Sequence, residues 1–305
     1  MAAPLLIAVV GPTAAGKSAV GMRLAAEHQG EIVSCDSLQV YRGLDIGSAK
    51  PTREERARVA HHLIDVADPD EAFTAAEYGR RARKALADIR GRGRLPLVVG
   101  GSGLYLRALL SGLFEGPSRD QALRERLEKI ADRFGDARLH RLLRGVDPEA
   151  AARIEPRDRR RVVRALEVFR ATGRALSQHH RDGAEPLAGF DVRLVGLHPP
   201  RETLRRAVER RTDEMLAAGL LEETRALVAR YAPGLRPLQA IGYRQAAAVV
   251  RGEMEVEDAR RDMVKETMRY AKRQMTWFRH QAVVRWCATG DEAHARASGW
   301  IQQAR

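Results

Sequence analysis

Short apolar runs and amphipathic stretches alternate over the first third of the chain. The apolar runs 5–10, 31–34, 62–66 and 95–99 have the length of β-strands, and segments with helical periodicity separate them. Strands that alternate with helices in this way are typical of βαβ units, so we predict an α/β fold with a parallel sheet flanked by helices. A later apolar run, 191–197, is expected to return to the same sheet.

The middle of the chain has a different pattern, because no strand-like run occurs between residues 116 and 186. Helical segments with dense charge fill this region, and Asp158 is placed to cap a helix over residues 159–172. We therefore predict an all-helical insertion, residues 116–186, between two parts of an α/β core, residues 1–115 and 187–305.

The first predicted strand leads directly into a complete phosphate-binding motif. Residues 11–18 read Gly-Pro-Thr-Ala-Ala-Gly-Lys-Ser and match G-x4-G-K-[ST], which makes the predicted core P-loop NTPase-like. In such a loop backbone N–H groups converge on one anion, Lys17 reaches the outer phosphates, and the Ser18 hydroxyl suits Mg²⁺. The residues predicted to bind a phosphorylated substrate are Gly11, Pro12, Thr13, Ala14, Ala15, Gly16, Lys17 and Ser18.

The balance of charges suggests a polyanionic partner. The chain has 53 Lys and Arg against 40 Asp and Glu, a net charge of +13 at pH 7. Nucleic acid is the favoured partner, although the choice of Arg over Lys can also reflect coding-sequence composition. The two cysteines, Cys35 and Cys287, have no metal-ligand spacing and fit a reducing cytoplasm. No apolar segment approaches the ~20 residues of a membrane span.

Two strand ends carry candidate site residues. Asp36 follows the second predicted strand, and the glycine-rich segment 100–103 follows the fourth. Because ligands bind outside the carboxyl ends of parallel strands, Asp36 and Lys17 should face one crevice, where the carboxylate could act as a general base. A turn role is the alternative for Asp36, since Asp-Ser is common turn chemistry. The segment 100–103 is equally consistent with a tight turn alone.

Basic clusters indicate where a phosphate backbone could bind. One cluster surrounds the single Asp158 at the start of the predicted insertion helix and consists of Arg157, Arg159, Arg160, Arg161 and Arg164. This bias favours phosphate contact over an ordinary solvated face. Arg210 or Arg211 could supply a second cationic arm to a pyrophosphate. A long basic helix predicted over residues 257–280 carries Trp277 and Phe278, which we expect to be core anchors rather than stacking platforms.

Taken in order, several of these segments resemble the bacterial tRNA dimethylallyltransferase family. The resemblance is carried by the phosphate loop, by Ser-Cys-Asp-Ser at 34–37 and by Val-Tyr-Arg-Gly-Leu-Asp-Ile-Gly-Ser-Ala-Lys-Pro at 40–51. It continues through His-His-Leu-Ile-Asp at 61–65, Val-Val-Gly-Gly-Ser at 98–102, Ala-Ile-Gly-Tyr-Arg at 240–244 and Ala-Lys-Arg-Gln-Met-Thr-Trp-Phe at 271–278. The matches extend over nearly the whole chain.

The resemblance implies transfer of a dimethylallyl group from dimethylallyl diphosphate to the exocyclic N6 amine of an adenosine. That adenosine lies immediately 3′ of the anticodon in tRNAs that read codons beginning with U, and pyrophosphate is the second product. By position, Asp36 would be the general base, Lys17 and Arg211 the other catalytic residues, and Ser18 a ligand of the required Mg²⁺. We expect a monomeric cytoplasmic enzyme whose partners are the anticodon stem-loop and the diphosphate.

The resemblance also implies a set of tRNA contacts, with the helical insertion as a clamp on the anticodon loop. The implied contact residues are Asp36, Ser37, Leu38, Gln39, Ser102, Arg124, Arg160, Arg161, Val162, Val163, Arg164, Gln239, Ala240, Ile241, Gly242, Tyr243 and Arg244. Ser18 and Ser102 stand where the family commonly has Thr, and both keep a hydroxyl. Arg160 stands where a relative carries Gln, so its contact depends on charge rather than on a specific polar group.

The residues alone leave three other functions open. A small-molecule kinase would bind ATP in the same loop, with Asp36 activating a hydroxyl. An adenylate isopentenyltransferase would share the chemistry but use a free nucleotide as acceptor. An RNA-binding P-loop protein would use nucleotide only as a switch. The basic charge and the arginine-rich insertion favour tRNA over a free nucleotide.

Overall fold

The computed structural model describes residues 3–114, 116–117, 120–183, 185–232 and 234–304. The chain divides into two compact units. The first unit consists of Met1–Leu109 and Leu187–Arg305, and the second is Leu110–Pro186. The predicted insertion, residues 116–186, lies within the second unit.

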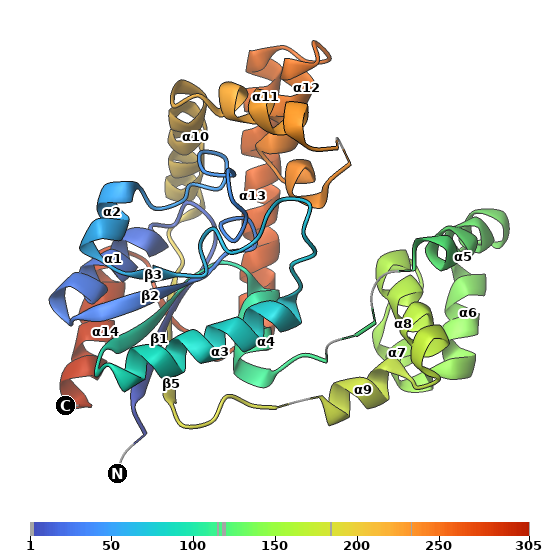
Figure 1. Ribbon diagram of the computed structural model, residues 1–305, viewed down its shortest axis with the longest axis horizontal. Coiled ribbons are helices and arrows are strands. Elements are labelled where there is room, and N and C mark those ends of the chain that lie inside the picture. The colour runs from blue at the N-terminus through green and yellow to red at the C-terminus, as the bar shows by residue number, and fades with distance from the viewer. Residues whose placement is uncertain (1–2, 115, 118–119, 184, 233, 305) are drawn as a thin grey trace. The chain divides into compact units, whose positions relative to one another are not determined.

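A six-stranded parallel sheet forms the centre of the first unit (Figure 1). Its strands are β1 (Leu5–Val10), β2 (Gly30–Cys35), β3 (His61–His62), β4 (Leu95–Gly100), β5 (Asp191–Leu197) and β6 (Arg285–Cys287). They lie in the order β3-β2-β4-β1-β5-β6, and each neighbouring pair is parallel. The prediction of a parallel α/β sheet flanked by helices is confirmed.

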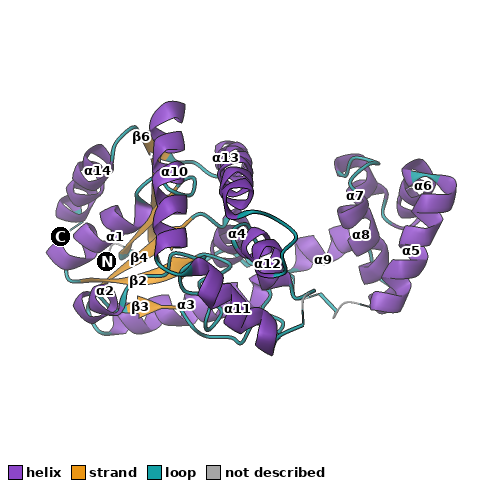
Figure 2. Ribbon diagram, turned by 90° about the horizontal axis from the view of Figure 1, so that it is seen from above, coloured by secondary structure: helices purple, strands orange, loops and turns teal. Residues whose placement is uncertain are grey.

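Helices cover both faces of this sheet and extend beyond the carboxyl ends of its strands (Figure 1). They are α1 (Lys17–Glu27), α2 (Arg53–Arg58), α3 (Ala75–Gly91), α4 (Gly103–Ser111), α10 (Arg201–Ala217), α11 (Leu220–Arg230), the 3-10 helix η1 (Arg236–Gln239), α12 (Tyr243–Val250), α13 (Val256–Gln281) and α14 (Gly290–Gln303). Helices α1 and α14 pack together on one face, and α3 lies on the other, as Figure 2 shows. No helix of the described ranges is long and apolar enough to cross a bilayer.

The side chains of β1 alternate between the two faces. Leu5, Ile7 and Val9 belong to a buried cluster with residues of α1 and α14. Because successive side chains of a strand point to opposite faces, Leu6 and Ala8 point to the α3 side, where they are also buried. Burial on both faces explains why this strand is a continuous apolar run, as expected for a central parallel strand.

The third strand differs from its prediction. A strand was expected over residues 62–66, but β3 contains only His61 and His62. Leu63 and Asp65 follow with φ of 62° and 57°, left-handed values that a strand cannot contain. The Lys50 ammonium, whose side chain is 2% exposed, donates to Asp65 at 2.6 Å. The prediction is therefore wrong beyond His62, because a buried ion pair rather than strand pairing fixes this segment.

The second unit contains helices joined by loops, and no strand occurs among its described residues. Its helices are α5 (Gln121–Phe134), α6 (Asp136–Val146), α7 (Pro148–Arg153), α8 (Arg159–Thr172) and α9 (Leu176–Asp182). Helix α8 begins as predicted, because the Asp158 side chain accepts the Arg161 N–H, and it ends at Gly173 with φ of 70°. A cluster of leucine, valine, isoleucine and alanine side chains forms the core of this unit.

Candidate functional site

The phosphate loop joins β1 to α1 in a conformation that favours small residues. Gly11, Ala14 and Gly16 have positive φ, of 135°, 60° and 89°. A Cβ on Gly11 would lie 2.6 Å from the Leu197 carbonyl oxygen, so the close approach of β5 excludes a side chain there. Helix α1 then begins with no side-chain cap and no acidic residue in its first turn. Its N-terminal N–H groups and its dipole are therefore available to an anion.

Lys17 is the first residue of α1 and reaches back over the loop. Its Nζ donates to the Pro12 carbonyl oxygen at 2.6 Å. Burial lowers the pKa of Lys17 to about 8, the Arg211 guanidinium adds to this effect, and the Asp36 carboxylate opposes it. The three predicted catalytic residues are thus close enough to act on one another electrostatically. An anion bound beside Lys17 would raise its pKa again and hold it protonated.

The two candidate arginines of α10 have different surroundings. Arg211 donates from Nη1 to the Thr13 hydroxyl at 3.3 Å. Burial lowers the pKa of Arg211, and the Asp36 carboxylate raises it. The Arg210 side chain is 71% exposed and lies 3.6 Å from Glu214 on its own helix. Arg211 is therefore the residue that faces the phosphate loop.

Asp36 comes directly after β2, at the same end of the sheet as the phosphate loop. Its Oδ1 accepts the N–H groups of Leu38 at 2.8 Å and Gln39 at 3.4 Å, which forms a turn at the strand end. Its Oδ2 has no hydrogen-bond donor within the described ranges. The turn role and the base role are therefore compatible, because Oδ1 serves the turn while Oδ2 stays able to accept a proton.

The glycine-rich end of β4 lies directly against the end of β2. The Ser102 N–H donates to the Cys35 carbonyl oxygen at 3.1 Å, and Cys35 pairs with Gly100 in the sheet. A Cβ on Gly100 would lie only 2.1 Å from the same Cys35 oxygen. Gly100 therefore allows a close backbone approach that fixes Asp36 beside Ser102, whose side chain is half-buried.

Gln39 holds the loop that follows Asp36. Its carboxamide oxygen accepts from the Ser34 hydroxyl at 2.8 Å, and its nitrogen donates to the Ala49 carbonyl at 3.1 Å. The protein itself thus uses both ends of the Gln39 side chain, and the contact of Gln39 with tRNA stays a prediction. Ser37 is exposed and Leu38 is half-buried, so these two stay accessible to a ligand.

A carboxylate tether connects the same loop to the C-terminal helices. Glu223 on α11 accepts the backbone N–H groups of Asp45, Ile46 and Gly47 at 2.9–3.2 Å, and the Tyr243 hydroxyl donates to it at 2.6 Å. A Cβ on Gly47 would lie 2.5 Å from the Tyr243 ring, so the backbone of the loop packs directly against that ring at Gly47. The tether fixes the segment that begins at Asp36.

Burial differs among the predicted tRNA-contact residues of the stretch 239–244. Tyr243 is 0% exposed and is engaged with Glu223, so its side chain is not available to tRNA. Gly242 is buried at the start of α12, and its N–H donates to Gln245. Within this predicted stretch Gln239 and Arg244 are exposed, while Ala240 and Ile241 are half-buried.

Two predicted tRNA-binding arginines are engaged inside the helical unit. The Glu167 side chain is 0% exposed, and Arg124 contacts it through two hydrogen bonds of 2.9 Å. Arg164 donates to the same carboxylate at 2.7 Å. Burial alone would raise the pKa of Glu167, but these hydrogen bonds lower it to about 2. Arg124 and Arg164 therefore stabilise the unit, and the direct phosphate contact expected of them stays a prediction, since their side chains are 22% and 31% exposed.

The neighbouring residues of α8 divide into buried and exposed sets. Val162 and Val163 are 0% and 3% exposed and belong to the core of the helical unit, so their side chains cannot contact tRNA. Arg160 and Arg161 are exposed. Arg161 pairs with Asp158 at 3.3 Å, and Arg160 has no ion-pair partner among the residues that are described. The predicted tRNA contacts on α8 stay a prediction, and Arg160 and Arg161 are the most exposed side chains of that stretch.

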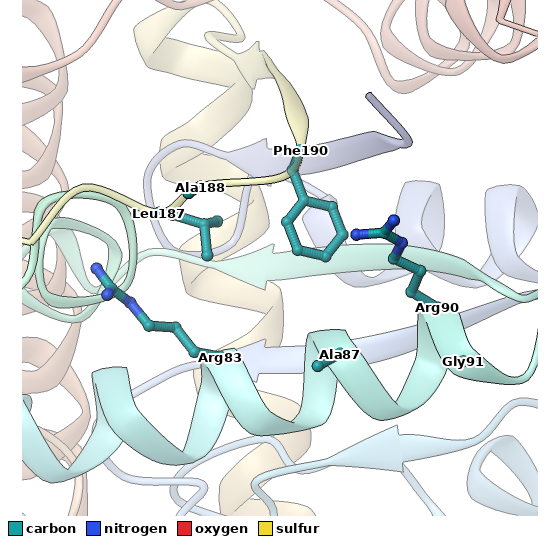
Figure 3. A pocket seen from close by; sticks show the side chains of 7 residues that line it. All are labelled: Arg83, Ala87, Arg90, Gly91, Leu187, Ala188 and Phe190. Carbon is teal, nitrogen blue, oxygen red and sulfur yellow. The ribbon is translucent and has the colours of Figure 1, made fainter. Parts of the chain in front are cut away.

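A shallow pocket of about 420 Å³ lies elsewhere on the first unit, beside α3 (Figure 3). Its walls are Arg83, Ala87, Arg90, Gly91, Leu187, Ala188 and Phe190. The Arg90 guanidinium lies 5.8 Å from the centre of the Phe190 ring. None of these residues belongs to the phosphate loop or to the end of β2, so this pocket is separate from the candidate site.

The sequence analysis missed two polar residues that position the site. Glu223 contacts a loop 176–178 residues earlier in the chain, and Gln274 contacts Thr13 from 261 residues away. Spacing along the chain contains no signal for such contacts. Phe278 is buried as predicted, and Trp277 is half-buried.

Comparison with known proteins agrees with this architecture. Residues 39–281 match the IPP transferase family model. The tRNA dimethylallyltransferase of Koribacter versatilis (strain Ellin345) is 49% identical over 294 residues, with 96% of each chain covered. The crystal structure of the tRNA isopentenylpyrophosphate transferase from Bacillus halodurans matches with a TM-score of 0.71 at 38% identity, covering 98% of this chain and 97% of that one. A eukaryotic dimethylallyltransferase acting on tRNA matches with a TM-score of 0.78 at 26% identity, covering 98% and 80%. The chain therefore belongs to the IPP transferase family, the family of the tRNA dimethylallyltransferases.

Proposed function

We propose that this protein transfers a dimethylallyl group from dimethylallyl diphosphate to the N6 amine of the adenosine immediately 3′ of the anticodon in tRNA. Relatives named tRNA dimethylallyltransferase, with near-complete coverage, support the reaction and the acceptor. The observation that carries the proposal is the placement of Lys17, Arg211 and Asp36 at one end of the sheet. The two cations can stabilise a departing diphosphate, and Oδ2 of the carboxylate can accept a proton from an attacking amine.

The proposed step forms one bond and breaks one. The N6 nitrogen forms a bond to the first carbon of the dimethylallyl group, and the bond from that carbon to the diphosphate oxygen breaks. The electron pair of that bond leaves with pyrophosphate, and the N6 proton passes to the Asp36 carboxylate. Asp36 is needed because the nitrogen lone pair of adenine is delocalised into the ring, which makes the neutral amine a weak nucleophile.

The phosphate loop would stabilise the charge on the leaving group. Backbone N–H groups at the start of α1, the Lys17 ammonium and the Arg211 guanidinium all lie at this end of the sheet. Fixed donors and cations in a partly buried site stabilise a developing anion more than water does. We propose that the loop Gly11–Ser18 holds the pyrophosphate while the carbon chain leaves.

We also propose a Mg²⁺ ion at this loop. Ser18 is exposed at the N-terminus of α1, and its hydroxyl has no protein partner in the described part of the chain. No group of three His, Cys, Asp or Glu side chains in that part could hold a metal by itself. A single hydroxyl ligand beside a bound diphosphate fits Mg²⁺, which is commonly held by few protein ligands together with water and substrate phosphates. Bound there, the ion would supply further charge neutralisation for the pyrophosphate.

The adenosine must leave the anticodon-loop stack to reach Asp36, because base-modifying enzymes act on bases that are unstacked or flipped. We propose that exposed cations bind the phosphates around it. Arg160 and Arg161 on the helical unit and Arg244 on the first unit remain exposed. Such contacts should weaken steeply with salt, since each one releases condensed counterions.

One incubation separates this function from its alternatives. The protein is mixed with Mg²⁺, dimethylallyl diphosphate labelled in its carbon chain, unmodified tRNA and AMP as a competing acceptor. Label is counted in tRNA and in AMP, released pyrophosphate is measured separately, and a parallel mixture contains ATP labelled in its γ-phosphate. We expect label in tRNA. Label in AMP would support the adenylate isopentenyltransferase, and phosphate transfer from ATP with no labelled tRNA would support the kinase. RNA binding without any covalent product would support the switch protein.

A further inference from the structure

Gln274 connects the phosphate loop to the end of β4. It lies on the inward face of α13 and is 6% exposed. Its Oε1 accepts the Thr13 N–H at 2.9 Å, and its Nε2 donates to the Gly101 carbonyl oxygen at 2.9 Å. One buried carboxamide thus satisfies two backbone groups from two different strand-to-helix loops.

The surrounding backbone is shaped to receive this side chain. A Cβ on Gly101 would lie 2.3 Å from the Gln274 Nε2 and 3.1 Å from the Gly11 carbonyl oxygen. Three residues further along α13, the Trp277 ring occupies the space where a Cβ on Gly103 would lie, at 2.3 Å. Glycine at both positions lets α13 contact the β4–α4 loop at two points.

Thr13 is held from two sides as a result. Its N–H is bound by Gln274 on α13, and its hydroxyl accepts from Arg211 on α10. One helical turn before Gln274, Tyr270 interacts with the Gln274 side chain and lies in the electrostatic field of Asp36. Hydrogen bonds of Gln274 therefore join the phosphate loop to the β4–α4 loop, whose Ser102 N–H donates to the carbonyl oxygen of Cys35, the residue before Asp36.

We propose that Gln274 is a positioning residue for the transfer reaction. Its carboxamide fixes the phosphate loop against the carboxyl end of β4, and this sets the position of the diphosphate relative to the acceptor base. This inference rests on the proposed function. Gln274 need not touch either substrate. The role requires an acceptor and a donor on one planar group. A carboxylate at this position lacks the donor, and a thioether lacks both groups.

The test uses three variants. Gln274→Met has similar length and removes both hydrogen bonds, while Gln274→Glu keeps the acceptor and gains a donor only when protonated. Gln281→Met makes the same chemical change at an exposed position near the end of the same helix and serves as the control. Each variant is compared with the wild type by thermal melting, by tRNA binding and by single-turnover transfer with enzyme in excess.

We expect Gln274→Met to lower the single-turnover rate constant by roughly tenfold to a hundredfold, because small misplacements of reacting groups have effects of this size. The KM for dimethylallyl diphosphate should rise, and the dissociation constant for tRNA should stay within about twofold of the wild type. The ratio of the Gln274→Glu single-turnover rate constant to that of the wild type at the same pH should increase as the pH falls, since a protonated carboxyl can donate to Gly101 and accept from Thr13. Gln281→Met should match the wild type.

A purely structural role predicts different data. It would lower the melting temperature or the reaction amplitude but leave the rate constant and the KM unchanged, and that result would overturn the proposal. A Gln274→Glu rate that does not recover relative to the wild type in acid would also overturn it, and this second variant decides the question if Gln274→Met does not fold. Failure of the proposed function is distinguishable, because the wild type itself would then transfer no label.

Discussion

From the hydrogen bonds of Glu223 we predict that this one carboxylate holds the loop after Asp36 in place. Replacing Glu223 with alanine leaves four donors without their acceptor, the N–H groups of Asp45, Ile46 and Gly47 and the Tyr243 hydroxyl. Asp45 is exposed, so water can replace the carboxylate there. The Tyr243 hydroxyl and the N–H groups of Ile46 and Gly47 are sheltered, and the first two lose the most because their bonds are the shortest, at 2.6 and 2.9 Å.

The expected cost follows from the Tyr243 hydroxyl and the Ile46 N–H, the two donors with the shortest bonds. Hydrogen bonds to a charged acceptor contribute about 1.5–3 kcal/mol each, so Glu223→Ala should lower the free energy of unfolding of the first unit by about 3–6 kcal/mol. The loop carries Asp36 at its start, so the single-turnover rate should fall by roughly tenfold or more. Urea denaturation followed by circular dichroism measures the first effect, and labelled transfer measures the second.

The neighbouring glutamate provides a matched control. Glu222 has a 68% exposed side chain, and its one ion-pair partner among the described residues is Arg225, at 3.8 Å. Glu222→Ala should therefore change the free energy of unfolding by less than about 0.5 kcal/mol and leave transfer unchanged. If Glu223→Ala and Glu222→Ala unfold at the same denaturant concentration, the carboxylate does not hold the loop and the reasoning is refuted.

Three further predictions concern charge. Lys17 loses its proton as the pH rises through about 8, so the KM for dimethylallyl diphosphate should increase above that pH in a steady-state pH series; a flat profile from pH 7 to pH 9.5 would contradict it. Arg211→Ala should raise the same KM by roughly tenfold or more, whereas Arg210→Ala, which alters an exposed side chain, should leave it within about twofold; equal effects would contradict the assignment. Glu167→Gln should destabilise the helical unit by about 3–5 kcal/mol, and the exposed Glu155→Gln should not. The stability that Glu167 contributes is present above its unfolded pKa of about 4.3 and is lost as the pH falls toward 2. Thermal melts of the wild type recorded between pH 6 and pH 2 measure this loss. If the melting temperature of Glu167→Gln falls with acid as much as that of the wild type, Glu167 is not the cause.

The sequence predicted those parts of the fold that local patterns determine. Residues 5–10 are a continuous apolar run that becomes β1, because a strand buried on both faces needs continuous apolar side chains. Residues 191–197 become β5, whose second half is buried while its first three residues, Asp191 and Arg193 among them, are half-buried. Helix α8 has its predicted bounds because a capping aspartate and a terminating glycine define both ends. The predicted strand at 62–66 failed because its conformation depends on a buried lysine from another segment.

The candidate site was predictable only in part for the same reason. The phosphate loop is contiguous, so its spacing identifies it without any tertiary information. The roles of the other candidate residues depend on which of their side chains are buried, and burial is determined by the tertiary structure. Arg124 and Arg164 look like phosphate ligands in a basic sequence, but a single buried glutamate engages both of them. Gln274 carries no local signal, since its partners are a backbone N–H and a carbonyl oxygen in two distant loops.

The central claim is that Asp36 accepts the N6 proton while the phosphate loop retains pyrophosphate. The direct measurement is nucleoside analysis by mass spectrometry of unmodified tRNA incubated with dimethylallyl diphosphate, Mg²⁺ and either the wild type, Asp36→Asn or Asp88→Asn, which makes the same chemical change at an exposed position on α3. We predict one dimethylallyl group on the adenosine 3′ of the anticodon with the wild type and Asp88→Asn. The rate should be lower by roughly 10²–10⁴ with Asp36→Asn, whose tRNA binding is retained. Unmodified tRNA with the wild type, or undiminished modification by Asp36→Asn, would contradict the account.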